Sequence, residues 1–340
     1  MKHIGTTLTH HLLEEEHRFQ HTSGELSRVL SQLGLAAKVL QAEISRAALD
    51  NELGYVGTVN TTGDAQKKLD VFANNVVTNA FAETGLVAGI ISEESDQLEV
   101  LSTGASAKYV LCIDPIDGSS NTDINGTVGT IFSVYRRKGS HEKSEKDIQN
   151  EVLTGQADHV AAGYVMFGTS TLLVYTAGGP LNGFTLDRTV GEFLLSHRNI
   201  QCPKHGKTYS ANLGHYCEWP DGVKKYVDWV QNIDAPSGRP YSLRYTGSLT
   251  ADLHRTLVEG GLYFYPPDAN HTGGKLRLMY EMRPLAMVVE AAGGRASDGR
   301  RRILEIPMEG IHQQGPFVIG SAENVAEFER FNSEAAGAGH

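Results

Sequence analysis

The sequence predicts a layered fold of the α/β or α+β class. Apolar residues at helical spacing dominate the first 50 positions, and short apolar stretches typical of strands follow between 86 and 176. Both kinds of element mix in the second half. The 340 residues suffice for about two domains with separate cores. Because the composition changes near 199–207, we predict an N-terminal domain at 1–198 and a C-terminal domain at 199–335.

The first elements are predicted to be helices. Residues 9–50 carry apolar side chains at a spacing of about 3.6 residues, which favours an amphipathic helix. A turn-rich break at 54–63 precedes a second helix with an apolar face from Leu69 to Phe81. Asp64 stands where a helix N-cap is expected.

The later elements are predicted from apolar runs and turn signals. The expected strands are 86–91, 109–113, 130–135, 161–166, 171–176, 261–265 and 317–320. The expected helices are 223–230, 250–259 and 279–292, the last closed by two glycines. The polar stretch 138–156 is predicted to be a surface loop, and the small residues after Ser333 are predicted to fray.

Composition excludes some classes of function. Lys and Arg number 30 and Asp and Glu number 40, so the formal net charge is −10, which argues against a nucleic-acid binder. No apolar run approaches the roughly 20 residues of a membrane span, and the N-terminus shows no signal core. We therefore expect a cytoplasmic protein without a membrane partner. The three cysteines, Cys112, Cys202 and Cys217, form no C-x-x-C pair and are expected to be free thiols.

The strongest local motif is the stretch from Asp114 to Ser120, Asp-Pro-Ile-Asp-Gly-Ser-Ser. Asp114 follows a predicted strand, and ligands of open α/β sheets bind at carboxyl ends of strands. Asp117 comes three residues later, after Pro115. Gly118 and the two serines then offer N–H groups and hydroxyls that suit a phosphate. Two carboxylates beside a phosphate site require cations between them.

Further carboxylates follow the same logic. Glu93 and Glu94 end another predicted strand, Asp64 and Asp70 flank the start of a helix, and Glu281 follows a basic stretch. Converging carboxylates repel each other unless divalent cations neutralise them. Two such ions about 3.5–4 Å apart can serve phosphoryl transfer. Taken singly, each motif is more often a cap, a turn or a solvated loop, and spacing does not show that the motifs meet in space.

The whole set resembles the class I fructose-1,6-bisphosphatases in order and spacing from about Thr6 to Glu329. The matching pieces are Thr61-Thr62-Gly63-Asp64, Lys67-Lys68-Leu69-Asp70, Ser92-Glu93-Glu94, the Asp114 motif, Tyr245-Thr246-Gly247-Ser248, Asp252-Leu253-His254-Arg255 and Gly274-Lys275-Leu276-Arg277-Leu278 with Glu281. The Asp114 motif is shared with the wider lithium-sensitive superfamily, including inositol monophosphatases. The resemblance implies the fold of this superfamily. It also implies hydrolysis of fructose 1,6-bisphosphate to fructose 6-phosphate in gluconeogenesis.

The resemblance also implies a role for each matching residue. Metal ions, two or more Mg²⁺ or Mn²⁺ per subunit, would be held by Glu93, Asp114, Ile116, Asp117 and Glu281, with Ile116 using its backbone carbonyl. Glu94 and Asp70 would activate the attacking water, and Asp64 would assist when its loop closes. The implied substrate-binding residues are Asp117, Gly118, Ser119, Ser120 and Arg277 at the 1-phosphate and Asn212, His215, Tyr245, Tyr265 and Lys275 at the sugar and 6-phosphate. Arg244 would reach a neighbouring subunit of a homotetramer.

Two departures from the family pattern concern binding and regulation. His215 stands where the family usually has a tyrosine on the 6-phosphate, and Tyr216 is next to it, so either side chain is a candidate for that contact. The stretch 138–156 contains no cysteine, so the thiol switch of the plant chloroplast relatives is not expected there.

Allosteric inhibition by AMP is a further implication of the resemblance. The residues that match the family's AMP site are Ser23, Gly24, Glu25, Leu26, Ser27, Lys108, Tyr109 and Arg136. Serines replace the usual threonines at 23 and 27, which keeps the hydroxyl and loses a methyl group. Taken alone, the stretch 23–25 is more simply a helix start.

Two alternatives to a fructose-1,6-bisphosphatase remain open at this point. One is a phosphatase acting on sedoheptulose 1,7-bisphosphate, alone or with the fructose substrate. The other is an inactive family member that only senses a nucleotide or binds a partner. The complete carboxylate set argues against the second alternative, because an inactive member is expected to have lost at least one of these residues.

Overall fold

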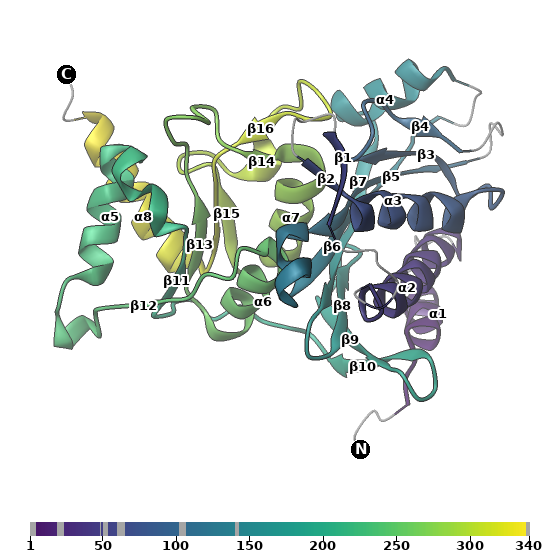
Figure 1. The fold of residues 1–340 in the computed structure, drawn as a ribbon, viewed down its shortest axis with the longest axis horizontal. Helices are drawn as coiled ribbons and strands as arrows, with labels where there is room; N and C mark the ends of the chain where they lie inside the picture. The colour runs from purple at the N-terminus through teal and green to yellow at the C-terminus, as the bar shows by residue number, and fades with distance from the viewer. Residues whose placement is uncertain are drawn as a thin grey trace.

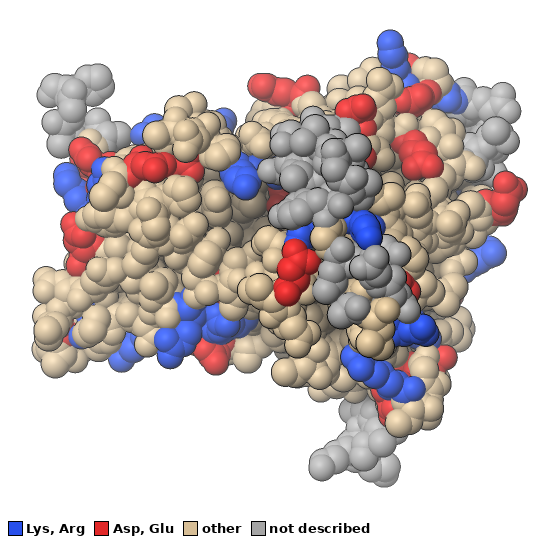
Figure 2. Space-filling model, viewed as in Figure 1, with Lys and Arg blue, Asp and Glu red and all other residues tan. Residues whose placement is uncertain are grey.

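The computed structural model describes residues 5–18, 24–47, 49, 54–59, 65–101, 107–139 and 143–337. Helices and sheets alternate in layers across the molecule (Figure 1). The predicted layered class is therefore confirmed. None of the helices in these residues combines the length and apolar character that crossing a bilayer requires. On the face drawn in Figure 2, acidic and basic side chains are intermixed in small groups.

The largest sheet of the described residues has eight strands in the order β10-β9-β8-β7-β6-β5-β3-β4. The strands are β3 (Val87–Ser92), β4 (Glu99–Val100), β5 (Tyr109–Asp117), β6 (Val128–Arg136), β7 (Asp158–Phe167), β8 (Thr171–Thr176), β9 (Asn182–Asp187) and β10 (Glu192–His197). β3 and β5 run parallel, whereas the pairs beside them run antiparallel. All residues of β3 and β5 are buried, as expected for strands covered on both faces.

Helices cover both faces of this sheet. α1 (Leu8–Arg18), α2 (Gly24–Ile44) and α3 (Lys68–Phe81) pack on one face, and α6 (Leu249–Glu259) and α7 (Arg283–Ala291) pack on the other (Figure 1). The predicted apolar face of α2 is confirmed, because Leu26, Leu33 and Leu40 are all buried in this core.

A second sheet lies beyond α6 and α7. Its described strands have the order β12-β11-β13-β17-β15, and α5 (Asp221–Gln231) and α8 (Ala322–Gly337) cover its outer face (Figure 1). The strands are β11 (Thr208–Ser210), β12 (Ser242–Leu243), β13 (Leu262–Tyr265), β15 (Arg295–Ser297) and β17 (Phe317–Gly320). α6 and α7 thus pack between the two sheets and join the two halves of the chain. A short pair, β14 (Leu276–Arg277) and β16 (Gln314–Gly315), lies apart from both sheets.

Several predicted elements were wrong in detail. The predicted long helix at 9–50 is two helices, α1 and α2, and the predicted break at 54–63 contains β1 (Tyr55–Val59), which pairs with β2 (Ala65–Lys67). The stretch 138–156 contains α4 (Glu145–Leu153), whose N-terminus is capped by Ser144. The chain after Ser333 stays helical to Gly337. The hairpin of β9 and β10 was not predicted.

Two helix starts also differ from the sequence prediction. α3 begins at Lys68 with Lys67 in the cap position, so Asp64 is not its N-cap, and Asp64 itself lies outside the described residues. The predicted helix at 279–292 begins as a π-helical turn, η4 (Leu278–Met282), before α7 takes over. Such π-turns occur mostly within helices at functional sites.

Candidate active site

A cavity of about 440 Å³ gathers predicted site residues from both halves of the chain. Its lining includes the predicted residues Asp70, Glu93, Glu94, Asp114, Ile116, Asp117, Gly118, Ser119, Ser120, Tyr245, Tyr265, Lys275, Arg277 and Glu281. The sequence places these residues up to about 200 positions apart, and the fold brings them around one space.

The parallel pairing of β3 and β5 explains why the acidic motifs meet. Ser92 pairs with Ile113, so Glu93 and Asp114, the next residue on each chain segment, lie side by side. We predicted that the strand ends at Ile113, but β5 continues to Asp117. Its register with β6 is irregular between Asp114 and Asp117. Side chains three apart in a regular strand point to opposite faces, so this irregularity lets both carboxylates line the cavity.

Glu281 enters the cavity from the π-helical turn η4. Its side chain is 6% exposed, and its Oε2 accepts a hydrogen bond from the Arg277 N–H. Arg277 is buried as well, and its Nη1 lies 3.5 Å from Oε1 of Glu93. The guanidinium thus offsets part of the negative charge beside Glu93.

The electrostatics of this end of the cavity favour a bound cation. Burial raises the pKa of Asp114 well above its usual range, and the charges of Glu93, Asp117 and Glu281 raise it further. Burial, with the charge of Glu93, raises the pKa of Glu281 to about 8. Asp114 Oδ1 is buried without a hydrogen-bond donor. These residues therefore fit divalent cations. Mg²⁺ prefers oxygen ligands, and a carboxylate oxygen that accepts no hydrogen bond can coordinate an ion.

Asp117 is anchored at the N-terminus of α6. Its Oδ2 accepts from Ser248 Oγ at 3.0 Å, from Thr250 N at 2.8 Å and from Thr250 Oγ1 at 2.8 Å, and its Oδ1 accepts from Leu249 N at 3.1 Å. Burial raises the pKa of Asp117, and these bonds oppose the rise. Since a carboxylate oxygen can accept two bonds, Oδ1 retains capacity for a further ligand.

Asp70 and Lys67 form the wall next to α3. Asp70 accepts from the Lys67 N–H at 3.0 Å, and burial raises the pKa of its carboxyl. The Lys67 ammonium lies 2.7 Å from Asp123 Oδ2 in η1 (Ser119–Ile124), the short helix that begins with the predicted phosphate-binding serines. The start of α3 is thus tied to that helix.

Tyr245, Tyr265 and Lys275 also line the cavity. Tyr265 also borders a small adjoining cavity of about 10 Å³ that is lined by Asn212 and His215. Tyr216 is directed elsewhere, because its hydroxyl donates to Asp228 Oδ1 on α5 at 2.6 Å. Of the two candidates for the 6-phosphate contact, His215 lines this small cavity and Tyr216 does not.

Two acidic side chains, Glu218 and Asp268, lie near His215. Ligand atoms of His215, Glu218 and Asp268 lie within 4.8 Å of one another, and His215 Nδ1 is 3.4 Å from Glu218 Oε2. Asp268 is held by the His271 N–H at 2.7 Å. This cluster borders the small cavity and is separate from the carboxylates around Asp114.

Arg244 does not line the cavity of its own chain. Its side chain is exposed, and its Nη1 donates to the carbonyl of Leu243 at 2.9 Å. Asp64 and Ser23, for which the sequence predicts roles, lie outside the described residues.

A second cavity of about 640 Å³ lies between α1, α2 and the large sheet. Three predicted AMP residues, Leu26, Ser27 and Arg136, line it. Gly24 and Glu25 begin α2, and the Glu25 carboxylate lies 2.8 Å from the Lys108 ammonium. Tyr109 is 2% exposed and does not line the described part of this cavity.

Some contributors were not identified from the sequence. Tyr263 and Leu249 line the active-site cavity, and Thr250 holds Asp117. The sequence could have indicated Tyr263, because it stands two positions before Tyr265 in one strand and so faces the same side of the sheet. It could not have indicated Thr250, because its contact with Asp117 spans 133 positions.

Comparison with known proteins identifies relatives over almost the whole chain. Residues 6–198 match the family model "Fructose-1-6-bisphosphatase, N-terminal domain", and residues 202–333 match the corresponding C-terminal domain. A class 1 fructose-1,6-bisphosphatase of Acaryochloris marina is 53% identical over 96% of this chain and 97% of its own length. That of Chlorobium phaeovibrioides is 48% identical over the same shares.

Solved structures agree with these matches. The holo form of Leishmania major fructose-1,6-bisphosphatase has a TM-score of 0.90 and 39% identity, and the match covers 96% of this chain and 99% of that one. A structure of the same protein described as its T-state has a TM-score of 0.86 and 37% identity, covering 97% of this chain and 99% of that one.

Proposed function

The chain belongs to the class 1 fructose-1,6-bisphosphatases and hydrolyses fructose 1,6-bisphosphate to fructose 6-phosphate and phosphate, and we propose that the 440 Å³ cavity is where this happens. One observation carries the proposal. Carboxylates suited to cations and the polar side chains of Tyr245, Tyr265 and Lys275 line the same cavity. This arrangement suits a sugar with a phosphate at each end.

The acidic end would hold the cations and the reacting phosphate. Glu93, Asp114, Asp117 and Glu281, with the carbonyl of Ile116, would bind two or more Mg²⁺ or Mn²⁺. Bound cations neutralise charge on the phosphate and favour ionisation of the attacking water. Gly118, Ser119, Ser120 and Arg277 would orient the 1-phosphate for attack in line with the leaving sugar oxygen.

Proton transfer is assigned to the carboxylates beside this group. Glu94, with Asp70, would take the proton of the water as its oxygen bonds to phosphorus. The bond between phosphorus and the sugar oxygen breaks, and that oxygen takes a proton from solvent water to leave as the C1 hydroxyl, while the proton held by Glu94 returns to solvent. Asp64 would assist when its loop closes.

The other end would recognise the sugar and the 6-phosphate through Asn212, His215, Tyr245, Tyr265 and Lys275. Arg244 would act on a neighbouring subunit of a homotetramer. Its exposed side chain, outside the cavity of its own chain, supports that assignment. The cytoplasmic location and the division of the chain at residue 199 remain predictions.

Substrate range tests this proposal. We expect phosphate release from fructose 1,6-bisphosphate with Mg²⁺ and none above background in chelator, because the buried carboxylates repel the phosphate without cations. The same assay on sedoheptulose 1,7-bisphosphate decides whether the cavity accepts a longer sugar. Faster release from a sugar monophosphate than from either bisphosphate would contradict the proposed two-ended site.

We also propose that AMP inhibits the enzyme through the 640 Å³ cavity. Lys108 and Arg136 would bind the nucleotide phosphate, and Leu26 and Ser27 lie where α2 meets the cavity. AMP would hold the loop bearing Asp64 open, so AMP and Mg²⁺ would weaken each other's binding. A T-state structure of the Leishmania major relative supports a regulated enzyme of this kind.

Inhibition should weaken about tenfold or more in Lys108→Met and Arg136→Met, because hydrogen bonds from charged groups contribute about 1.5–3 kcal/mol. The measurement is a Mg²⁺ titration of activity at several AMP concentrations. Lys138→Met is the matched control, because Lys138 and Arg136 pair with the same carboxylate. Lys138 Nζ lies 2.9 Å from Asp158 Oδ1, and Arg136 Nη2 lies 3.6 Å from Asp158 Oδ2. Equal inhibition of all variants, or none at millimolar AMP, would reject this site.

A further inference from the structure

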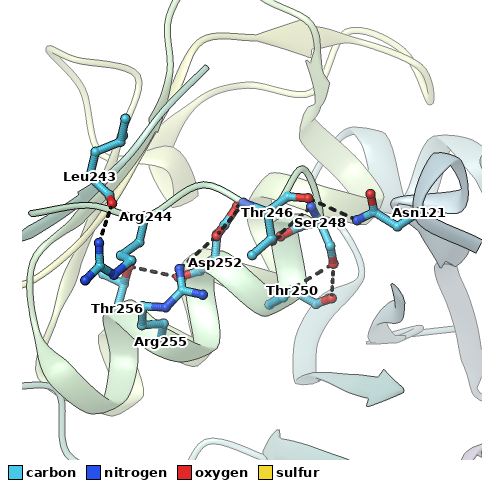
Figure 3. A network of polar contacts seen from close by, with 10 residues as sticks. Asn121, Leu243, Arg244, Thr246, Ser248, Thr250, Asp252, Arg255 and Thr256 are labelled. Atoms are coloured by element: carbon cyan, nitrogen blue, oxygen red, sulfur yellow. Dashed lines mark hydrogen bonds and ion pairs between the residues drawn. The ribbon is translucent and has the colours of Figure 1, made fainter. Parts of the chain in front are cut away.

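Thr246, at the centre of the segment 244–248 between β12 and α6, is held by side chains on two sides (Figure 3). The Thr246 N–H points between the two carboxylate oxygens of Asp252, at 3.1 and 3.0 Å. The Thr246 carbonyl accepts a hydrogen bond from Asn121 Nδ2 at 3.2 Å. Thr246 directly follows Tyr245, which lines the cavity.

Asp252 holds the segment from the second half of the chain. The residue is 0% exposed and lies in the first turn of α6, and Arg255 Nη1 lies 3.1 Å from its Oδ1. The backbone of Asp252 is held in α6, and burial and the ion pair with Arg255 hold its carboxylate in one position. The Thr246 N–H is therefore fixed relative to α6.

Asn121 holds the same segment from the first half of the chain. It lies in η1, two residues after Ser119, and is 7% exposed. Its amide donates to Thr127 O as well as to Thr246 O, both at 3.2 Å, so both amide hydrogens are used. Asn121 thus ties the helix that begins at the proposed 1-phosphate site to the segment that carries Tyr245.

We propose that Asn121 and Asp252 are positioning residues that set the span between the two ends of the cavity. This inference rests on the proposed function, in which the two ends hold the two phosphates of one substrate. With the span fixed, binding of the 6-phosphate places the 1-phosphate correctly at the carboxylates. Misplacement of a reacting group by about 1 Å can cost about 10²-fold in rate.

The positioning role predicts a change in substrate preference rather than a general loss. Fructose 1-phosphate lacks the 6-phosphate and gains nothing from a correct span. In Asn121→Ala and Asp252→Asn we expect the ratio of kcat/KM for fructose 1,6-bisphosphate to kcat/KM for fructose 1-phosphate to fall about tenfold or more. Asp252→Asn replaces one acceptor oxygen with a donor and removes the charge that pairs with Arg255.

Thr256→Val is the matched control. Thr256 is buried in α6, and its hydroxyl donates to the backbone carbonyl of Asp252 at 2.9 Å and not to the carboxylate that accepts from Thr246. This variant should melt at a lower temperature and keep the parent ratio. If Asp252→Asn does not fold by circular dichroism, Asn121→Ala alone decides the outcome.

The outcomes separate this inference from the proposed function. A parent enzyme without preference for the bisphosphate would contradict the two-ended site itself. A parent that prefers the bisphosphate, with variants that keep this preference, would overturn the positioning role alone. Equal losses on both substrates would show that the two residues are merely structural, and would also overturn it.

Discussion

Replacing Glu94 with Gln is expected to lower kcat by about 10²–10⁴-fold, the usual contribution of a general base. Glu94 follows β3, lines the cavity and is half-buried, and its N–H donates to Ser92 Oγ at 3.2 Å. Gln preserves the size of the side chain but does not accept a proton from water. Because the backbone contact is unaffected, the fold should stay intact.

Steady-state kinetics with circular dichroism checks this expectation. Glu99→Gln is the matched control, since Glu99 accepts from Thr78 Oγ1 at 3.2 Å and does not line the cavity. Mixing Glu94→Gln with Arg244→Ala subunits adds a test of the shared site, because some sites in a mixed oligomer would regain both residues. Turnover of Glu94→Gln within a few-fold of the parent would exclude Glu94 as the base.

Replacing Asp114 with Asn is expected to lower the rate of phosphate release by at least about 10²-fold. Changes to residues that only support metal ligands already cost about 10–100-fold in metal affinity or activity, and Asp114 is proposed as a ligand. The same variant should melt at a higher temperature than the parent in chelator. Burial and the charges of Glu93, Asp117 and Glu281 disfavour the ionised form of the Asp114 carboxyl, so the neutral amide of Asn avoids the cost of holding an ionisable group there.

Thermal melts in EDTA and in excess Mg²⁺ check the second half of this prediction. The parent should gain more stability from Mg²⁺ than Asp114→Asn, since binding to the folded state stabilises it. A variant that melts lower than the parent in EDTA would indicate that Asp114 is structural.

Local sequence patterns predicted much of the fold. The helical period placed Leu26, Leu33 and Leu40 in the core, where they are buried. The apolar runs identified β3, β5, β6, β7 and β8, and the carboxylates of Glu93 and Asp114 meet because β3 and β5 are parallel. The stretch 138–156 was misjudged because a helix with a large polar face resembles a loop in composition.

Other features depend on contacts between distant parts of the chain. The anchoring of Asp117 by Thr250 and the tie from Asn121 to Thr246 each span more than 120 positions. The direction of the Tyr216 side chain depends on Asp228, which lies 12 positions later and accepts a hydrogen bond from the Tyr216 hydroxyl. Single-sequence spacing carries no information about such contacts.

Binding of Mn²⁺ measured by electron paramagnetic resonance, with fructose 6-phosphate and phosphate present, tests the central claim most directly. The parent should bind two or more ions per chain, and Asp114→Asn and Glu281→Gln should each bind fewer. Glu218→Gln serves as control for the separate cluster of His215, Glu218 and Asp268, and should retain the ions of the cavity. Equal binding by the parent, Asp114→Asn and Glu281→Gln would contradict the assignment of the carboxylate cavity as the metal centre.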